Sequence, residues 1–205
     1  MDLIKTKSAY KVYSLYLIWT LVLTLIGSVV GTFLPIGNGF LIGYGIVSLF
    51  LSIALALSEG KTKKILLNIF CFGEGLFLSP LANWFSPNLL VYALMVTVFI
   101  TILAMIVGSK IKYSKKFGQI LYTILWVGFI YTLLCMFFPL PAFSILFVIL
   151  FTAYIAYDIS LFKEEVKNYN GELSTDEIID HVTMMYLNIL NLFLRILEFL
   201  AELSN

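Results

Sequence analysis

The sequence predicts an all-α membrane protein of seven transmembrane helices, in which three helical hairpins surround a central seventh helix with a polar stripe. Composition is the first reason: of the 205 residues, 61% are apolar and 12% are charged, whereas soluble domains average about half apolar and a quarter charged. Length is the second, because a hydrocarbon core of ~30 Å needs ~20 apolar residues per helix, which gives about seven spans. We expect one transmembrane domain over residues 1–205.

The order of the elements follows from charged residues, prolines and glycines, which divide the chain into apolar segments. The predicted spans lie near 10–34, 39–58, 65–85, 89–108, 119–138, 142–162 and 181–203. Lysines cluster before the first span and after the second, fourth and sixth, while the three other turns are uncharged. Cytoplasmic loops carry an excess of Lys and Arg. The N-terminus is therefore predicted to be cytoplasmic and the C-terminus to lie on the opposite side.

The connection over residues 163–180 is predicted to be an acidic cytoplasmic loop. It holds six acidic residues, and Asn170-Gly171 marks a turn within it. Residues 174–177 (Ser-Thr-Asp-Glu) have the pattern of a capped helix start. Such a loop could concentrate Ca²⁺ at a pore mouth or bind a partner.

The seventh predicted helix carries a polar stripe along one face. Its members are spaced three and four residues apart: His181, Met184, Asn188, Asn191, Arg195, Glu198 and Glu202. A charge at mid-bilayer costs at least ~2.5 kcal/mol, so this stripe should face protein or water. The alternative is an amphipathic helix on the membrane surface, but those usually carry Lys and Arg on the polar face. We therefore expect the stripe to line the interior of the bundle.

Two other ionisable residues lie within predicted spans, and both need partners. Asp158 is about one turn from the cytoplasmic end of the sixth span, at the depth of Asn188. Glu74, between two glycines near the middle of the third span, reaches the level of Arg195. We expect Asp158 to pair with Asn188 and Glu74 with Arg195. Two alternatives stay open: Arg195 pairs instead with Glu198, or each polar contact only fixes helix packing.

Three segments resemble the Bax inhibitor-1 family of small seven-helix membrane proteins. They are Tyr157-Asp158 at the end of the sixth span, residues 186–193 (Tyr-Leu-Asn-Ile-Leu-Asn-Leu-Phe), and the looser 75–80 (Gly-Leu-Phe-Leu-Ser-Pro). The second resembles the family's Tyr-Leu-Asp-x-Ile-Asn-Leu-Phe. The resemblance implies a seventh helix wrapped by the other six. It also implies a pH-sensitive calcium leak, in which one Asp on the sixth helix and one on the seventh share a proton.

The first of those carboxylates maps to Asp158, but the second position is Asn188 in this sequence. An amide and a carboxylate cannot share a proton as two carboxylates do, so pH-dependent gating is not expected to carry over. A cation could still meet the Asp158 carboxylate and the Asn188 carbonyl oxygen. A second departure is Glu198, where relatives carry Arg near the end of this helix.

The expected function is therefore a membrane-embedded cation or calcium leak, with Asp158, Asn188, Asn191, Glu74, Arg195 and Glu198 along the ion pathway. Its only expected metal is transported or bound Ca²⁺, at Asp158 and Asn188. The alternative is a non-conducting regulator that binds a membrane protease or another membrane protein. A secondary transporter would usually have more spans and paired broken helices.

An enzyme is not expected: the spans lack the second carboxylate of an intramembrane aspartyl protease, usually in Gly-x-Gly-Asp. A rhomboid-type protease needs Ser and His within spans, and the one histidine, His181, is at a helix start beside the acidic loop. Nucleic acid is also excluded as a partner, since the net charge is only +1 and the lysines are scattered. The expected surroundings are the lipid bilayer. The short loops favour a bacterial inner membrane.

Overall fold

A computed structural model of the chain describes residues 3–4, 6–135, 144–168 and 173–204. Over these residues it contains seven helices of at least 19 residues, one short helix and two short strands. The long helices are α1 (Thr6–Thr32), α2 (Asn38–Leu57), α3 (Gly60–Leu78), α5 (Pro87–Lys110), α6 (Lys115–Cys135), α7 (Ser144–Asn168) and α8 (Thr175–Ser204). The short helix is α4 (Leu81–Trp84), and the strands are β1 (Leu3–Ile4) and β2 (Leu173–Ser174). The predicted all-α fold is confirmed.

Four of the described helices are long and apolar enough to cross a membrane, as judged by length and composition. These spans are Ser8–Thr32, Pro87–Lys110, Ser144–Asn168 and Thr175–Ser204, and Gly43–Leu57 is a shorter apolar helix. Large apolar side chains are exposed along the helices; Leu25, Phe50 and Phe99 are each more than 60% exposed. Soluble monomers rarely expose contiguous apolar surface on this scale. The protein is therefore an integral membrane protein.

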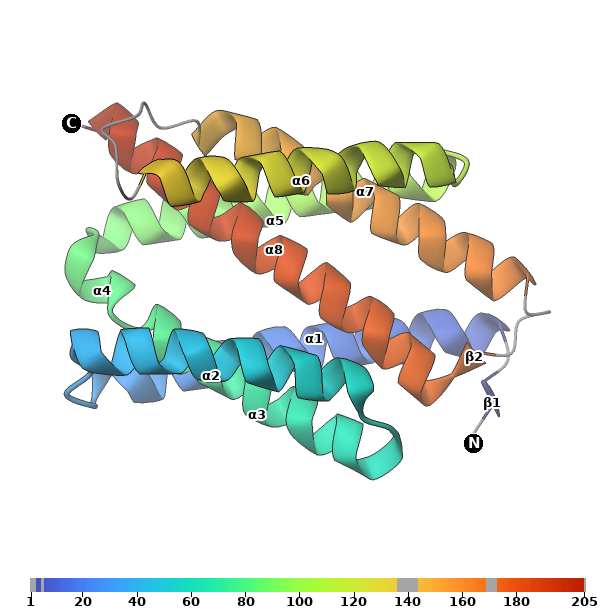
Figure 1. Ribbon diagram of the computed structural model, residues 1–205, viewed down its shortest axis with the longest axis horizontal. Coiled ribbons are helices and arrows are strands. Elements are labelled where there is room, and N and C mark those ends of the chain that lie inside the picture. The colour runs from blue at the N-terminus through green and yellow to red at the C-terminus, as the bar shows by residue number, and fades with distance from the viewer. Residues whose placement is uncertain (1–2, 5, 136–143, 169–172, 205) are drawn as a thin grey trace. The chain divides into compact units, whose positions relative to one another are not determined.

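The described residues pack as two compact units, where the sequence predicts one domain. The first comprises Met1–Pro87 and Val166–Tyr186, and the second comprises Asn88–Glu165 and Leu187–Asn205. Helix α8 contributes its N-terminal part to the first unit and its C-terminal part to the second (Figure 1). The wrapping of six helices around α8 stays a prediction.

In the first unit, α3 packs against both α1 and α2, and the three run side by side (Figure 1). The approach of α1 to α3 depends on facing glycines: a Cβ on Gly75 would lie 2.1 Å from the Thr24 carbonyl oxygen, and one on Gly27 would lie 2.2 Å from that of Phe72. Small residues at such crossings let membrane helices pack backbone to backbone. Tyr186 of α8 joins this packing, since its hydroxyl lies 2.6 Å from the Thr24 hydroxyl.

Several helix ends differ from the predicted spans. The third span (65–85) is broken at Ser79-Pro80, so α3 ends at Leu78 and α4 follows as one separate turn. The proline ring and its missing N–H explain why the helix does not continue unbroken. The uncharged turn between the fifth and sixth predicted spans, at Pro139-Leu140-Pro141, lies outside the described residues.

The predicted loop over 163–180 is largely helical. Helix α7 continues to Asn168, and α8 begins at Thr175. The capped start is confirmed: the Glu177 backbone N–H donates to the Ser174 hydroxyl at 3.2 Å, and the Glu177 carboxylate accepts from the Ser174 backbone N–H at 2.7 Å. β2, just before this cap, pairs antiparallel with β1. The Asn170-Gly171 turn lies outside the described residues.

Candidate functional site

The second unit brings Asp158 and Asn188 together, as the sequence predicts. The Asn188 side-chain NH₂ donates to the Asp158 carboxylate at 2.6 Å. Asp158 is only 6% exposed, and Asn188 is its only hydrogen-bond partner among the described residues. No cationic side chain among the described residues offsets the desolvation of this carboxylate, and an amide dipole offsets it less well than a cation would.

Helix α7 is positioned for this contact by close approaches from α5 and α6. A Cβ on Gly108 of α5 would lie 2.4 Å from the Ala156 carbonyl oxygen, so the two backbones touch. Gly118 of α6 makes room for the Tyr157 ring, which also packs on Tyr113 with centroids 5.7 Å apart. These contacts hold Ala156 and Tyr157, the two residues before Asp158, and so position the part of α7 that carries the carboxylate.

Beyond this pair, two further residues of the polar stripe on α8 contact α7. Arg195 stacks over the Phe147 ring, with its guanidinium carbon 4.5 Å from the centroid. Further along, the Ser144 hydroxyl donates to the Glu202 carboxylate at 2.6 Å. The contacts run in opposite order along the two helices, as they do in an antiparallel pair. In this unit three members of the stripe, Asn188, Arg195 and Glu202, thus contact α7.

The stripe is nevertheless less buried than the rest of α8. The fully buried positions of α8 are mostly apolar, such as Met185, Leu192 and Leu197, whereas Asn188, Asn191 and Arg195 keep intermediate exposure. Asn191 makes its described hydrogen bond within the helix, to the Leu187 carbonyl oxygen at 2.8 Å. The stripe therefore combines protein contacts with partial accessibility, the property that a hydrated pathway needs.

The alternative partner predicted for Arg195 is confirmed. Arg195 bonds Glu198 at 2.8 Å, one turn along the same helix. Glu74 instead accepts a hydrogen bond from the Ser48 hydroxyl of α2 at 2.5 Å. The glycines beside it serve packing: Gly73 makes room for the Tyr44 ring, and Gly75 meets the α1 backbone. A role for Glu74 in an ion pathway stays a prediction.

Two residues that sequence reasoning missed lie in the second unit. The hydroxyls of Tyr154 on α7 and Thr101 on α5 are buried and have no hydrogen-bond partner within the described part of the chain. Tyr154 is one turn before Asp158, so the two share a helix face. Buried hydroxyls without protein partners are sites for ordered water. The four-residue spacing between Tyr154 and Asp158 is the sequence signal that could have identified Tyr154; no such signal points to Thr101.

Among the described residues, no group of three or more His, Cys, Asp or Glu side chains is placed to hold a metal ion. Ca²⁺ binds six to eight oxygen ligands, and its affinity falls as the number of charged ligands falls. Asp158 alone with Asn188 can supply a transient contact to a cation, but not a high-affinity cage.

The acidic residues at the start of α8 are engaged with the first unit. Lys63 of α3, only 3% exposed, places its ammonium 2.7 Å from each Asp180 carboxylate oxygen. The Gly60 backbone N–H donates to the Asp176 carboxylate at 2.9 Å, and Glu177 belongs to the cap described above. Two of the carboxylates expected to attract Ca²⁺ or a partner, Asp176 and Asp180, thus hold α8 against α3, and a third caps α8 itself.

The comparisons with known proteins agree with this architecture. Residues 6–205 match the family described as Inhibitor of apoptosis-promoting Bax1. The sequence is also 32% identical over 148 residues to Bax inhibitor 1 of Schizosaccharomyces pombe, a match that covers 69% of this chain and 53% of that protein. The matched segment thus spans about half the length of this relative. The chain belongs to the Bax inhibitor-1 family.

Proposed function

We propose that the protein is a cation leak pathway whose cargo is Ca²⁺ and whose gate is the Asp158–Asn188 pair. One observation carries the proposal: a carboxylate that is 6% exposed and bonded at 2.6 Å to an amide rather than to a cationic side chain. A passing cation would relieve this uncompensated charge. The partial exposure of the stripe on α8 and the unpartnered hydroxyls of Tyr154 and Thr101 support a hydrated route beside it.

The geometry also suggests how the gate closes. The Asn188 NH₂ occupies the position beside the Asp158 carboxylate that a cation would take. When a cation arrives, rotation of the amide turns its carbonyl oxygen toward the ion, and water completes the shell. A single carboxylate holds the ion weakly, and conduction requires that an ion can leave as well as enter. The amide therefore competes with the cation for one acceptor.

The test is Ca²⁺ flux into liposomes that contain the purified protein, measured across a pH series. Wild type is expected to exceed empty liposomes, and Asp158→Asn to lose most of that flux because the charge is gone. Asn188→Asp places two carboxylates at hydrogen-bonding distance. A shared proton would hold them together at low pH, and their repulsion after its loss would open the gate, so flux should rise with pH.

Glu164→Gln is the matched control, since it removes one negative charge from the same helix but six residues beyond the gate; its flux should equal that of wild type. Flux no greater than that of empty liposomes for all of these proteins would overturn the leak and favour the non-conducting regulator of a membrane protein. Equal losses of Ca²⁺ flux in Asp158→Asn and Glu164→Gln would show that Asp158 is not the gate residue.

We further infer that the N-terminus is cytoplasmic, the C-terminus lies on the opposite side, and the membrane is a bacterial inner membrane. The lysine distribution supports the orientation. Contacts between the predicted cytoplasmic ends also support it: β1 pairs with β2, Lys63 with Asp180, and in the second unit the Lys163 ammonium with the Ser109 carbonyl oxygen at 2.7 Å.

Cysteine labelling tests this orientation in intact bacterial cells. In a Cys71→Ala/Cys135→Ala background, a membrane-impermeant maleimide should label Ser86→Cys in whole cells and Glu164→Cys only after lysis. The background without an added cysteine should remain unlabelled in both conditions. The reverse pattern would invert the topology.

A further inference from the structure

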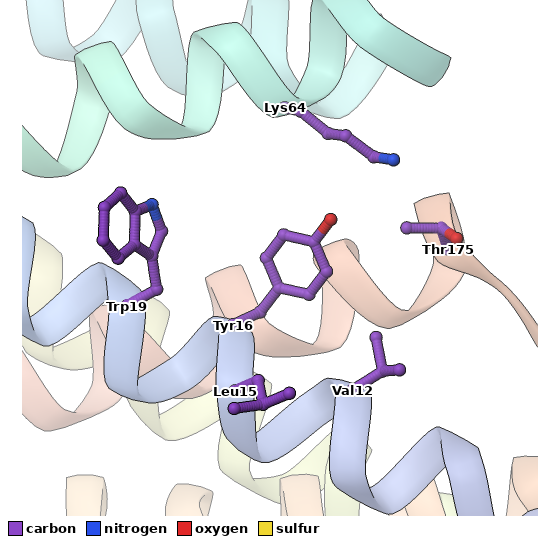
Figure 2. Close-up of a pocket in the computed structure, with 6 residues that line it drawn as sticks. All are labelled: Val12, Leu15, Tyr16, Trp19, Lys64 and Thr175. Carbon is purple, nitrogen blue, oxygen red and sulfur yellow. The ribbon is translucent and has the colours of Figure 1, made fainter.

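A pocket of about 540 Å³ lies in the first unit. Its lining comes from three helices: Val12, Leu15, Tyr16 and Trp19 of α1, Lys64 of α3, and Thr175 at the start of α8. Figure 2 shows the Lys64 ammonium, the Tyr16 hydroxyl and the Thr175 hydroxyl toward one side, with the Trp19 indole on the other. The pocket is thus apolar along α1 and polar toward the ends of α3 and α8.

The three polar groups of this pocket share an unusual property. Neither the Lys64 ammonium nor the Tyr16 and Thr175 hydroxyls have a hydrogen-bond or ion-pair partner among the residues that the structure describes. Trp19 differs, because its indole N–H donates to Asn68 at 2.9 Å and is therefore fixed in orientation. One ammonium and two hydroxyls around a single pocket form a donor set suited to a phosphate oxygen.

The acidic residues nearest in sequence to Thr175 do not neutralise Lys64. Asp180 is bonded to Lys63, Asp176 to the Gly60 backbone N–H, and Glu177 to Ser174. Lys63 and Lys64 are adjacent in sequence, yet only Lys63 has a carboxylate partner within the described residues. The positive charge of Lys64 is therefore available to a ligand that enters the pocket.

The pocket also has its polar groups at the depth of lipid headgroups and its apolar groups deeper in the membrane, as a lipid site does. Lys64 is near the N-terminal end of α3 and Thr175 begins α8, so the polar side lies at helix ends, where headgroups lie. Trp19 is eleven residues into the span that starts at Ser8, which corresponds to ~16 Å along the helix. A ligand that fills the pocket would thus extend from the headgroup level into the hydrocarbon core.

We propose that this pocket binds an anionic phospholipid. Its phosphate accepts hydrogen bonds from Lys64, Tyr16 and Thr175, and the first part of an acyl chain packs against Leu15 and Trp19. The negative phosphodiester complements the unpaired ammonium, and an aromatic residue is typical of sites at the membrane interface. The site is independent of the cation leak and does not require it.

Trp19 offers a direct reporter, because the chain has three tryptophans and the other two can be removed. Trp84→Phe/Trp126→Phe changes two exposed side chains and keeps an aromatic ring at each position. This variant is reconstituted in vesicles that contain brominated phosphatidylglycerol or brominated phosphatidylcholine, and Trp19 quenching is measured against the mole fraction of brominated lipid. We expect saturable quenching, with phosphatidylglycerol effective at about fivefold lower mole fraction.

Lys64→Gln in the same background should abolish the preference for phosphatidylglycerol. The matched control is Lys61→Gln, which removes an exposed lysine of the same helix that does not line the pocket; the preference should stay. Equal quenching by both lipids in the parent would overturn the proposal, as would equal loss in the two lysine variants, which would indicate diffuse surface charge.

Soluble glycerol phosphate distinguishes a lipid from a free phosphate. It lacks acyl chains, so millimolar concentrations should not reduce quenching by brominated phosphatidylglycerol; full displacement would make the pocket a phosphate site. A second measurement avoids the tryptophan changes altogether. Mass spectrometry of the purified full chain should find phosphatidylglycerol retained by wild type and Lys61→Gln but lost from Lys64→Gln, and equal retention by all three would contradict the site.

Discussion

Gly75→Ala is expected to destabilise the first unit by about 3 kcal/mol, at the upper end of the usual effect of overpacking. The added Cβ would lie 2.1 Å from the Thr24 carbonyl oxygen and 2.9 Å from the Gly27 Cα. Both are backbone atoms of α1, which cannot rotate away as the end of a flexible side chain can. The two helices must therefore separate, and the contacts along α1 and α3 weaken together.

The measurement is thermal unfolding in detergent, where this loss corresponds to a fall in Tm of roughly 9 °C for a chain of this size. Gly45→Ala is the matched control, because a Cβ at that position on α2 meets nothing within 4 Å; it should leave the Tm unchanged or raise it slightly. Gly27→Ala should resemble Gly75→Ala, and the double variant should lose less than the two together, since one separation relieves both clashes. Equal Tm values for Gly75→Ala and Gly45→Ala would show that the approach of α1 to α3 is looser than described.

The helices could be predicted from hydropathy, but their ends could not. A hydropathy pattern finds only the apolar part of a helix, so the charged turns 163–168 of α7 and 175–180 of α8 were assigned to a loop. The capping pattern at 174–177 is local chemistry and gave the correct start of α8. The break at Ser79-Pro80 was also visible in the sequence, although the apolar residues on both sides made the segment resemble one span.

In the candidate site, too, one contact could be predicted from the sequence and others could not. Depth along the membrane normal is readable from sequence, and it predicted Asp158 beside Asn188. Depth does not fix the direction in which a side chain leaves its helix, so it does not predict that Glu74 bonds Ser48 and Arg195 bonds Glu198. Arg195 reaches Glu198 within its own helix, at a lower entropic cost than a long-range pair requires.

The Lys63–Asp180 pair was missed because both residues appear in the sequence as ordinary loop charges. Its burial is unequal: the Lys63 side chain is 3% exposed and that of Asp180 is 40% exposed. Removal of the two partners should therefore have unequal effects. Asp180→Asn leaves an ammonium buried without its counterion, whereas Lys63→Met leaves a carboxylate that water can still solvate.

We expect Asp180→Asn to lower the free energy of unfolding by about 3 kcal/mol, the lower end of the range for a broken buried ion pair. Lys63→Met should cost roughly half as much, because the hydrated carboxylate avoids most of the desolvation penalty. Thermal unfolding of both variants at low and high salt measures this, and the salt dependence should be small because a buried ammonium is poorly screened.

The double variant Lys63→Met/Asp180→Asn decides what the pair does. If the main cost of Asp180→Asn is an orphaned buried charge, replacing that charge with an apolar side chain should recover most of the lost stability. If instead the double variant is as unstable as the sum of the single ones, the two residues act independently and α8 is held by other contacts. The hydrogen bond from the Gly60 backbone N–H to the Asp176 carboxylate is one of these. Recovery would show that the ion pair adds little net stability, because a methionine and an asparagine would then hold the start of α8 nearly as firmly as the ions do. The pair would then serve to make the docking of α8 specific.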